Sequence, residues 1–197
     1  MISNPPISTR SDLAAKVGVL LYDKTVAVDA ILADAVLRVR ARGIAVGGLL
    51  QRSGGLLPNG QPSLWLDDIG TGETIRLDQP RGPGAMDCIL DPDALARGAC
   101  LLRRATEAGH RLIVVNRFGH TETEGGGMRA EIAEAICSRA AVLIPVRFSR
   151  LSDLEGFLGG SAEVLVPSPA AIADWVEAIV NSLEDMTWGV MSRTIGS

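Results

Sequence analysis

Apolar residues fall in short runs that alternate with segments of helical periodicity. Residues 17–22, VGVLLY, are continuously apolar, as a strand buried on both faces requires, and residues 26–42 repeat apolar positions at helical spacing. Gly43 ends this helix, and the apolar run 44–51 returns as a second strand. The pattern therefore predicts a βαβ unit.

The segment after the second strand has a different pattern of apolar and turn-forming residues. Residues 63–79 contain two short strand-like runs around Gly70-Thr71-Gly72, which predicts a hairpin at an edge of the sheet. A helix is then predicted from a cap at Asp91, with Pro92 in its first position, to Gly109. The alternation continues with strands at 111–116, 141–148 and 162–167 and helices at 128–138, 150–158 and 169–184.

Strands that alternate with helices imply an α/β fold, with a mostly parallel sheet covered on both faces. We predict a single domain over residues 17–186, a disordered or loosely packed N-terminus at 1–16 and a flexible tail at 187–197. Ligands of such sheets bind at the carboxyl ends of the strands. The loops to inspect are 22–29, 51–62, 79–87, 117–127 and 147–151.

Composition narrows the classes of partner. A net charge of -4 and 4% aromatic residues argue against nucleic acid, which needs a basic face and stacking side chains. No apolar run approaches the length of a membrane span, and the first residues lack an apolar signal segment. We expect a cytoplasmic protein without membrane insertion. Cys88, Cys100 and Cys137 lie far apart, so we interpret them as reduced thiols.

The first strand-to-helix turn, YDKTVAVD, occupies the place of a phosphate-binding loop. Such a loop needs Gly-x-x-x-x-Gly-Lys-Ser/Thr so that the backbone wraps the phosphates, the lysine neutralises them and the hydroxyl holds magnesium. Every defining position is changed: the replacements are Tyr22, Ala27, Val28 and Asp29.

Two alternatives stay open for this turn. A displaced pair, Lys24-Thr25, could bind phosphate, although it follows the strand too closely to leave a phosphate-sized loop; otherwise the turn is simply solvated. Asp23 and Asp29 could bind a cation or an uncharged polar ligand, or Asp29 could only complement the helix dipole. Asp29 is the one candidate metal ligand.

A second polar group follows the strand at 111–116. Asn116 stands where a magnesium-holding carboxylate is expected, and Arg117 stands where a water-activating acid is expected. The loop continues through His120, Glu122 and Glu124 to three glycines before a helix, which suits an anion-binding nest or a flexible surface loop. The glycines are Gly125, Gly126 and Gly127.

Several of these segments resemble the uncharacterised bacterial family DUF2478, itself similar to the cancer-related and thermophile P-loop nucleoside-triphosphatases. The segments are LLYDKTVAVDAILA, IAVGGLLQ, LDDIGTGETIRLDQ, DCILDPDALA, VVNRFGHTETEGGGMR and VLIPVR. The resemblance implies a three-layer P-loop-like fold with a β-hairpin insertion after the second strand. The stretch ending at Gly119 matches the triphosphatases' Asp-Glu-x-Gly, and Glu122 matches one of their glutamates, but Asn116 and Arg117 depart from the acidic pair.

Genes of this family commonly lie beside molybdate-transport and nitrogenase genes, which implies a role in molybdenum or oxyanion metabolism. Molybdate is held by backbone amides and neutral or basic donors. Residues able to supply them are Arg52, Ser53, Gly54, Gly55, Arg81, Gly82, Gly84, Asn116 and Arg117. Cys88 could be a soft ligand or a small buried residue.

Three hypotheses follow. The first is a nucleotide- or oxyanion-binding accessory or regulatory protein, for which the cofactor is molybdate or Mg²⁺ with a nucleotide, without efficient hydrolysis. The second is an atypical NTPase in which Lys24-Thr25 binds phosphate, Asp29 holds magnesium, and Glu122 or Glu124 orients water. The third is an interaction module for molybdate-transport components or for a second copy, with contacts near Trp65 and Trp175.

Overall fold

The computed structural model describes residues 15–57, 60–78 and 90–194, with side chains as far as Glu184. Seven strands form one sheet in the order β4-β3-β2-β5-β6-β1-β7. They are β1 (Val17–Tyr22), β2 (Val46–Leu56), β3 (Pro62–Asp68), β4 (Thr74–Arg76), β5 (Leu112–Val114), β6 (Ala141–Arg147) and β7 (Glu163–Val164). The helices are α2 (Val28–Ala41), α3 (Pro92–Glu107), α4 (His120–Thr123), α5 (Arg129–Cys137), α6 (Leu151–Leu158) and α7 (Pro169–Thr194), with a 3-10 turn at Phe148–Arg150.

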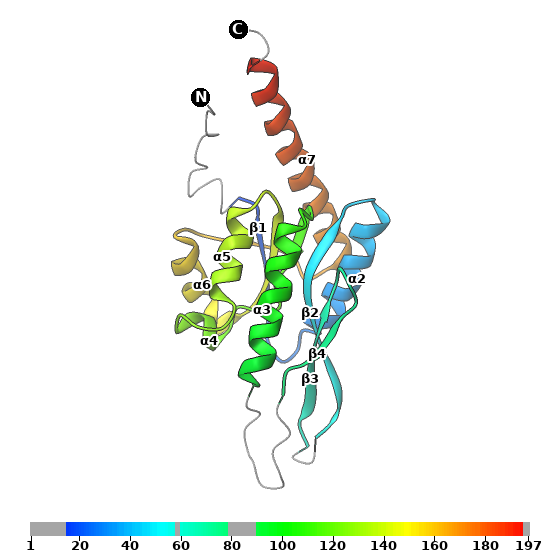
Figure 1. Cartoon of the computed structure of the whole chain (residues 1–197), viewed down its shortest axis with the longest axis vertical. Helices are drawn as coiled ribbons and strands as arrows, with labels where there is room; N and C mark the ends of the chain where they lie inside the picture. Colours follow the sequence, from blue (N-terminus) through cyan, green and yellow to red (C-terminus); the bar gives the residue numbers. More distant parts are fainter. Residues whose placement is uncertain (1–14, 58–59, 79–89, 195–197) are drawn as a thin grey trace.

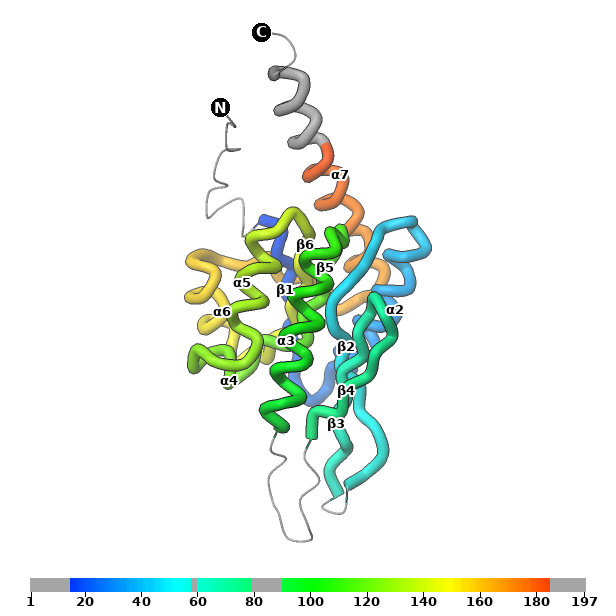
Figure 2. Tube along the Cα trace, in the orientation of Figure 1, coloured from blue at the N-terminus to red at the C-terminus, as the bar shows by residue number. Residues whose placement is uncertain are grey.

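Helices cover both faces of the sheet, as Figure 1 shows. On one face α3, α5 and α6 bury Leu102, Ile132 and Leu154 against the strands. On the other face α2 and α7 lie side by side and bury Val39 and Val176 (Figure 2). The three-layer α/β architecture expected from the alternating pattern is confirmed.

The strands β2, β5, β6, β1 and β7 are parallel, and the hairpin β3-β4 adds antiparallel strands at one edge. The parallel strands β1 and β6 are almost entirely buried, because helices cover both of their faces. The mostly parallel sheet and the edge position of the hairpin were both predicted correctly. Among the described residues, no helix has the length and apolar character needed to span a bilayer.

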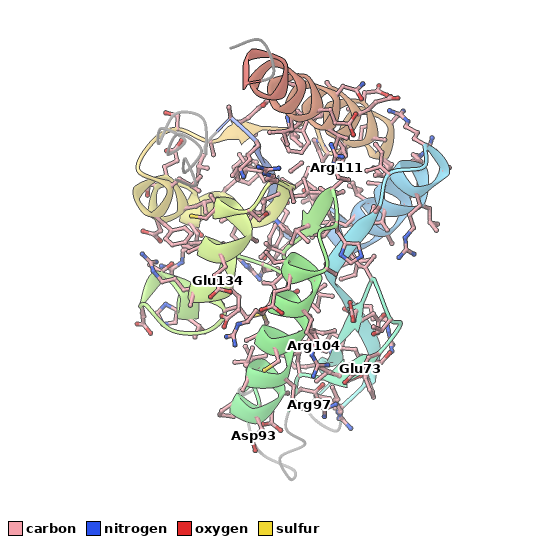
Figure 3. The ribbon with its side chains drawn as sticks, turned by 45° about the horizontal axis from the view of Figure 1, so that its top comes forward. Glu73, Asp93, Arg97, Arg104, Arg111 and Glu134 are labelled. Atoms are coloured by element: carbon pink, nitrogen blue, oxygen red, sulfur yellow. The ribbon has the colours of Figure 1, made fainter. Side chains whose placement is uncertain are left out.

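Helix α3 begins as its sequence predicts. The Asp91 carboxylate accepts a hydrogen bond of 2.9 Å from the Asp93 amide, and Pro92 takes the first helical position, where no amide hydrogen is needed. On its outer side, Arg97 pairs with Glu73 of the β3-β4 turn at 3.1 Å (Figure 3). Both side chains are exposed, so this pair contributes little to stability.

Several element boundaries depart from the sequence prediction. β2 continues to Leu56 through residues predicted as loop, because β3 pairs with it along that length. The loop 117–127 contains the short helix α4, and β7 is much shorter than the predicted strand 162–167. α7 extends to Thr194, beyond the end predicted for this helix at residue 184, and no proline interrupts the sequence after Pro169. The predicted N-terminal segment lies outside the described residues up to residue 14.

Gly48 marks a close approach between β2 and β5. Its φ is +104°, and a Cβ added there would lie 2.1 Å from the carbonyl oxygen of Val114 in β5. We expect Gly48→Ala to lower the free energy of unfolding by more than about 3 kcal/mol, because the obstacle is backbone that cannot move away. Gly43→Ala is the control: its φ is +77° but nothing lies within 4 Å, so only about 1–2 kcal/mol should be lost. Equal losses in urea unfolding would contradict this account.

Candidate functional site

The carboxyl ends of β5, β6 and β1 lie next to one another. Together they form the carboxyl edge of the sheet, which is distinct from the lateral edge where the hairpin β3-β4 lies. Because these strands are buried, polar side chains appear only where each strand ends. Asp23 follows β1, Asn116 and Arg117 follow β5, and Arg147 is the last residue of β6. The loops predicted to carry function at 22–29, 117–127 and 147–151 therefore meet at this edge.

The turn between β1 and α2 is short and closed by its own hydrogen bonds. The Asp23 carboxylate accepts bonds from the Thr25 amide, at 2.7 Å, and from the Thr25 hydroxyl, at 2.6 Å. These bonds lower the pKa of Asp23. The amide of Val28 donates to the carbonyl of Val26 at 2.9 Å. Amides that would cradle a phosphate chain are thus used inside the turn.

Lysine is scarce in this protein, which bears on phosphate binding. The only lysines in the sequence are Lys16 and Lys24, and neither follows a glycine. Lys24 is exposed in the turn, whereas Lys16 is buried at the start of β1, at the opposite end of that strand. Lys24 is therefore the one lysine that the fold places at this edge.

Arg117 joins three segments at the centre of the site. Its Nη2 lies 2.6 Å from Oδ1 of Asp29 in the first turn of α2, and its guanidinium carbon lies 4.9 Å from the ring centroid of Tyr22. The side chains of Arg117 and Asp29 are 23% and 28% exposed, so the pair is partly shielded from water. The structure thus brings together Arg117 and Asp29, which the sequence placed in separate loops.

The same contact bears on Asp29 as a metal ligand. A guanidinium on one of its oxygens places a positive charge where a cation would have to bind, and the two would repel each other. Across the described ranges 15–57, 60–78 and 90–194, no group of three His, Cys, Asp or Glu side chains is arranged to hold a metal ion.

A second arginine approaches the same aromatic ring. The guanidinium carbon of Arg147 lies 5.6 Å from the centroid of Tyr22, whose side chain is buried. Among the residues that the structure describes, Arg147 has no carboxylate partner. Sequence reasoning did not single out Tyr22 or Arg147 as ligand-binding residues. The available signal was an arginine that ends a buried strand next to β1.

Two buried polar atoms at the end of β5 lack hydrogen-bond partners within the described residues. They are Oδ1 of Asn116 and Nε of Arg117. An unsatisfied buried polar group costs about 1–3 kcal/mol, so such atoms usually mark a place where a water or a ligand binds. Both atoms belong to residues that the sequence identified as departures from the acidic pair of the triphosphatases.

The glycine-rich loop before α5 already holds an anion, which comes from the protein itself. The buried Glu122 carboxylate accepts bonds from the amides of Gly119, at 2.9 Å, and Met128, at 3.2 Å. A Cβ at Gly127 would lie 2.2 Å from Oε1 of Glu122, so the glycine lets the loop close on the carboxylate. Each carboxylate oxygen of Glu122 thus accepts a bond from a backbone amide, and the loop 125–127 closes on the carboxylate.

The remaining predicted site residues lie outside this centre. Glu124 is exposed and contacts His120 at 3.2 Å, and His120 in turn lies 3.3 Å from Arg150. Arg52 pairs with Asp67 at 2.7 Å and lies over Trp65 in the hairpin, and Ser53 is its exposed neighbour on β2. Trp175 is part of the core and donates to Glu163. Arg81, Gly82, Gly84 and Cys88 lie outside the described residues.

The fold and the strand-end site define a P-loop-like α/β protein. The solution structure of a human cancer-related nucleoside triphosphatase aligns with a TM-score of 0.54 over 89% of this chain and 97% of that chain. The sequence identity is 13%, so this likeness shows the fold alone. The chain belongs to the DUF2478 family of proteins of unknown function, whose model matches residues 17–175.

A curated relative extends the comparison. Over 163 residues the chain is 32% identical to "Molybdenum import ATP-binding protein ModC 2" of Bradyrhizobium diazoefficiens. The match covers 81% of this chain but 18% of that protein. The chain therefore spans less than a fifth of the relative's length.

The structural role of Glu122 can be measured directly. We expect Glu122→Ala to lower the free energy of unfolding by about 1–3 kcal/mol, because one buried and one partly buried amide lose their acceptor. Glu124→Ala removes an exposed carboxylate from the same helix end and should change stability by less than about 0.5 kcal/mol. Urea unfolding of both variants is the measurement, and a stability loss no greater in Glu122→Ala than in Glu124→Ala would be inconsistent with this role.

Proposed function

We propose that this protein binds a small anionic ligand, a nucleotide or an oxyanion such as molybdate, at Arg117, Arg147 and Asn116. It acts as an accessory or regulatory protein in molybdenum metabolism and does not hydrolyse nucleoside triphosphates efficiently. The observation that carries this proposal is the pair of arginines over Tyr22, of which, within the described part of the chain, only Arg117 contacts a carboxylate, that of Asp29.

The charge balance at this edge favours an anion. Arg117 and Arg147 approach one ring, and Asp29 neutralises only the first. The uncompensated charge stands out in a chain whose net charge is -4. A guanidinium donates two parallel hydrogen bonds to an oxyanion. In the adjacent turn the exposed Lys24 and its neighbour Asp23 carry opposite charges, so the excess positive charge comes from the arginines.

The same geometry argues against efficient phosphoryl transfer. Catalysis of that reaction depends on magnesium and on a positioned water, which acidic side chains normally hold. Here the strand that should end in acids ends in Asn116 and Arg117. Glu122 is bound to backbone amides, and the turn 23–27 is too short to wrap a triphosphate. An anion can be bound by these residues without being cleaved.

Two lines support the link to molybdenum. The curated relative, which is 32% identical to this chain over the matched residues, is named as an ATP-binding protein of molybdenum import. The match occupies 18% of that longer protein, so a segment like this chain is joined there to other sequence in one polypeptide. We propose that the present chain is a cytoplasmic partner of molybdate-transport components and that ligand binding governs this association.

Anion binding can be tested by calorimetric titration with molybdate, tungstate, sulfate, ATP and GTP, with and without magnesium, at constant ionic strength. We expect at least one of them to bind, and Arg117→Ala to weaken its binding by about 1–3 kcal/mol, the cost of a lost charged hydrogen bond. Arg147→Ala should weaken it in the same direction. Arg38→Ala is the control, since Arg38 is an exposed arginine on α2 that pairs with Asp34.

The outcomes separate the hypotheses. Binding that is lost with Arg117 and kept in the Arg38 variant supports the proposal. Binding that is unchanged in Arg117→Ala places the ligand elsewhere. If none of the anions binds, the proposal is rejected and the hypothesis of an interaction module remains. Steady release of phosphate from ATP or GTP would establish the atypical NTPase.

A further inference from the structure

We infer that Asp29 is an internal competitor for the anion: its carboxylate occupies Arg117 in the resting protein, and the ligand binds by displacing it. This inference rests on the anion binding proposed above and adds how that site is controlled. It gives Asp29 a role opposite to that of a metal ligand, because the residue lowers the affinity of the site for its ligand.

The contact between Asp29 and Arg117 uses only part of the guanidinium. Nη2 donates to Oδ1 of Asp29 at 2.6 Å, while Nε is buried and has no partner in the described part of the chain. In a planar guanidinium, Nε–H and one Nη–H point in the same direction and bind two oxygens of one anion. Asp29 therefore bonds to only one of these two N–H groups. An oxyanion that accepts hydrogen bonds from both makes the stronger contact.

The position of Asp29 keeps the free-energy cost of its release from Arg117 low. The residue lies in the first turn of α2, where the helix dipole stabilises a negative charge whether or not Arg117 is in contact. Its side chain is 28% exposed, so the freed carboxylate can be hydrated. Displacement therefore exchanges one partner of Asp29 for water without burying an unpaired charge.

Arg147 remains available to an anion while Asp29 is bound to Arg117. It lies 5.6 Å from the centroid of the ring that Arg117 also approaches, and no carboxylate among the described residues contacts it. An incoming anion thus meets one uncompensated arginine while Asp29 still holds the other. The measured affinity is then the intrinsic affinity reduced by the fraction of molecules in which Asp29 has left Arg117.

A purely supporting role for Asp29 predicts the reverse. If its carboxylate held Arg117 in the orientation needed by the ligand, removing the charge would weaken binding. The two roles therefore differ in the sign of a single measurement, which does not require the ligand to be identified beforehand.

The test is calorimetric titration of the full chain with molybdate and with ATP, comparing the wild type with Asp29→Asn. We expect the dissociation constant of the bound anion to fall about three- to tenfold, which is about 0.7–1.4 kcal/mol. Asp34→Asn is the matched control, because it removes the same charge from the same helix by breaking the exposed pair with Arg38. The control should bind as the wild type does.

A second comparison ties the gain to Arg117. In the Arg117→Ala background the substitution Asp29→Asn should give no gain, because the competitor has lost its target. A gain that persists there, or that Asp34→Asn reproduces, would reflect general charge removal and would overturn the inference. Urea unfolding confirms that each variant is folded.

The outcomes also distinguish this inference from the proposed function. If the wild type binds and Arg117→Ala does not, while Asp29→Asn binds equally or more weakly, Asp29 is no competitor but the anion site stands. If only Asp29→Asn binds, Asp29 blocks the site instead of yielding it to the ligand, so both the displacement and the proposed function are rejected. If neither protein binds either anion, both the inference and the anion site are rejected.

Discussion

The strands β1, β5 and β6 are covered by helices on both faces, and this double burial determines where polar side chains can stand. Charged side chains are excluded from the middle of these strands, because burying an unpaired ion there costs free energy. Polar residues therefore begin where the strands end, and the parallel register brings those ends to one edge. Tyr22, Asn116, Arg117 and Arg147 meet there for this reason, although they come from three distant segments of the chain.

At this edge a P-loop-like fold has been given a different charge pattern. Arg117, which follows β5, and Asp29, in the first turn of α2, form an ion pair of 2.6 Å. The glycine-rich loop is likewise filled from within, by Glu122. The described residues at this edge thus combine two arginines over Tyr22 with one carboxylate bound to Arg117.

The sequence predicts the architecture well because doubly buried strands and capped helices leave strong periodic signals. Asp91-Pro92 and the apolar run of β1 are examples, and both were placed correctly. It also pointed to Asn116, Arg117 and Asp29. It could not show that Arg117 reaches Asp29, because that contact depends on how α2 packs against the sheet. Nor could it show that Glu122 is inside, since buried and exposed glutamates look alike in a short loop. Arg147 was missed because a single arginine after an apolar strand has no distinctive spacing.

The most direct measurement of the central claim is the ¹⁵N NMR signal of the Arg117 Nε–H group, assigned with Arg117→Lys, during titration with molybdate and with ATP. Nε is buried without a partner among the described residues, so the account predicts a saturable shift of this signal as an anion oxygen accepts its hydrogen bond. An anion that binds while the Arg117 signal stays fixed and another arginine responds would contradict the account.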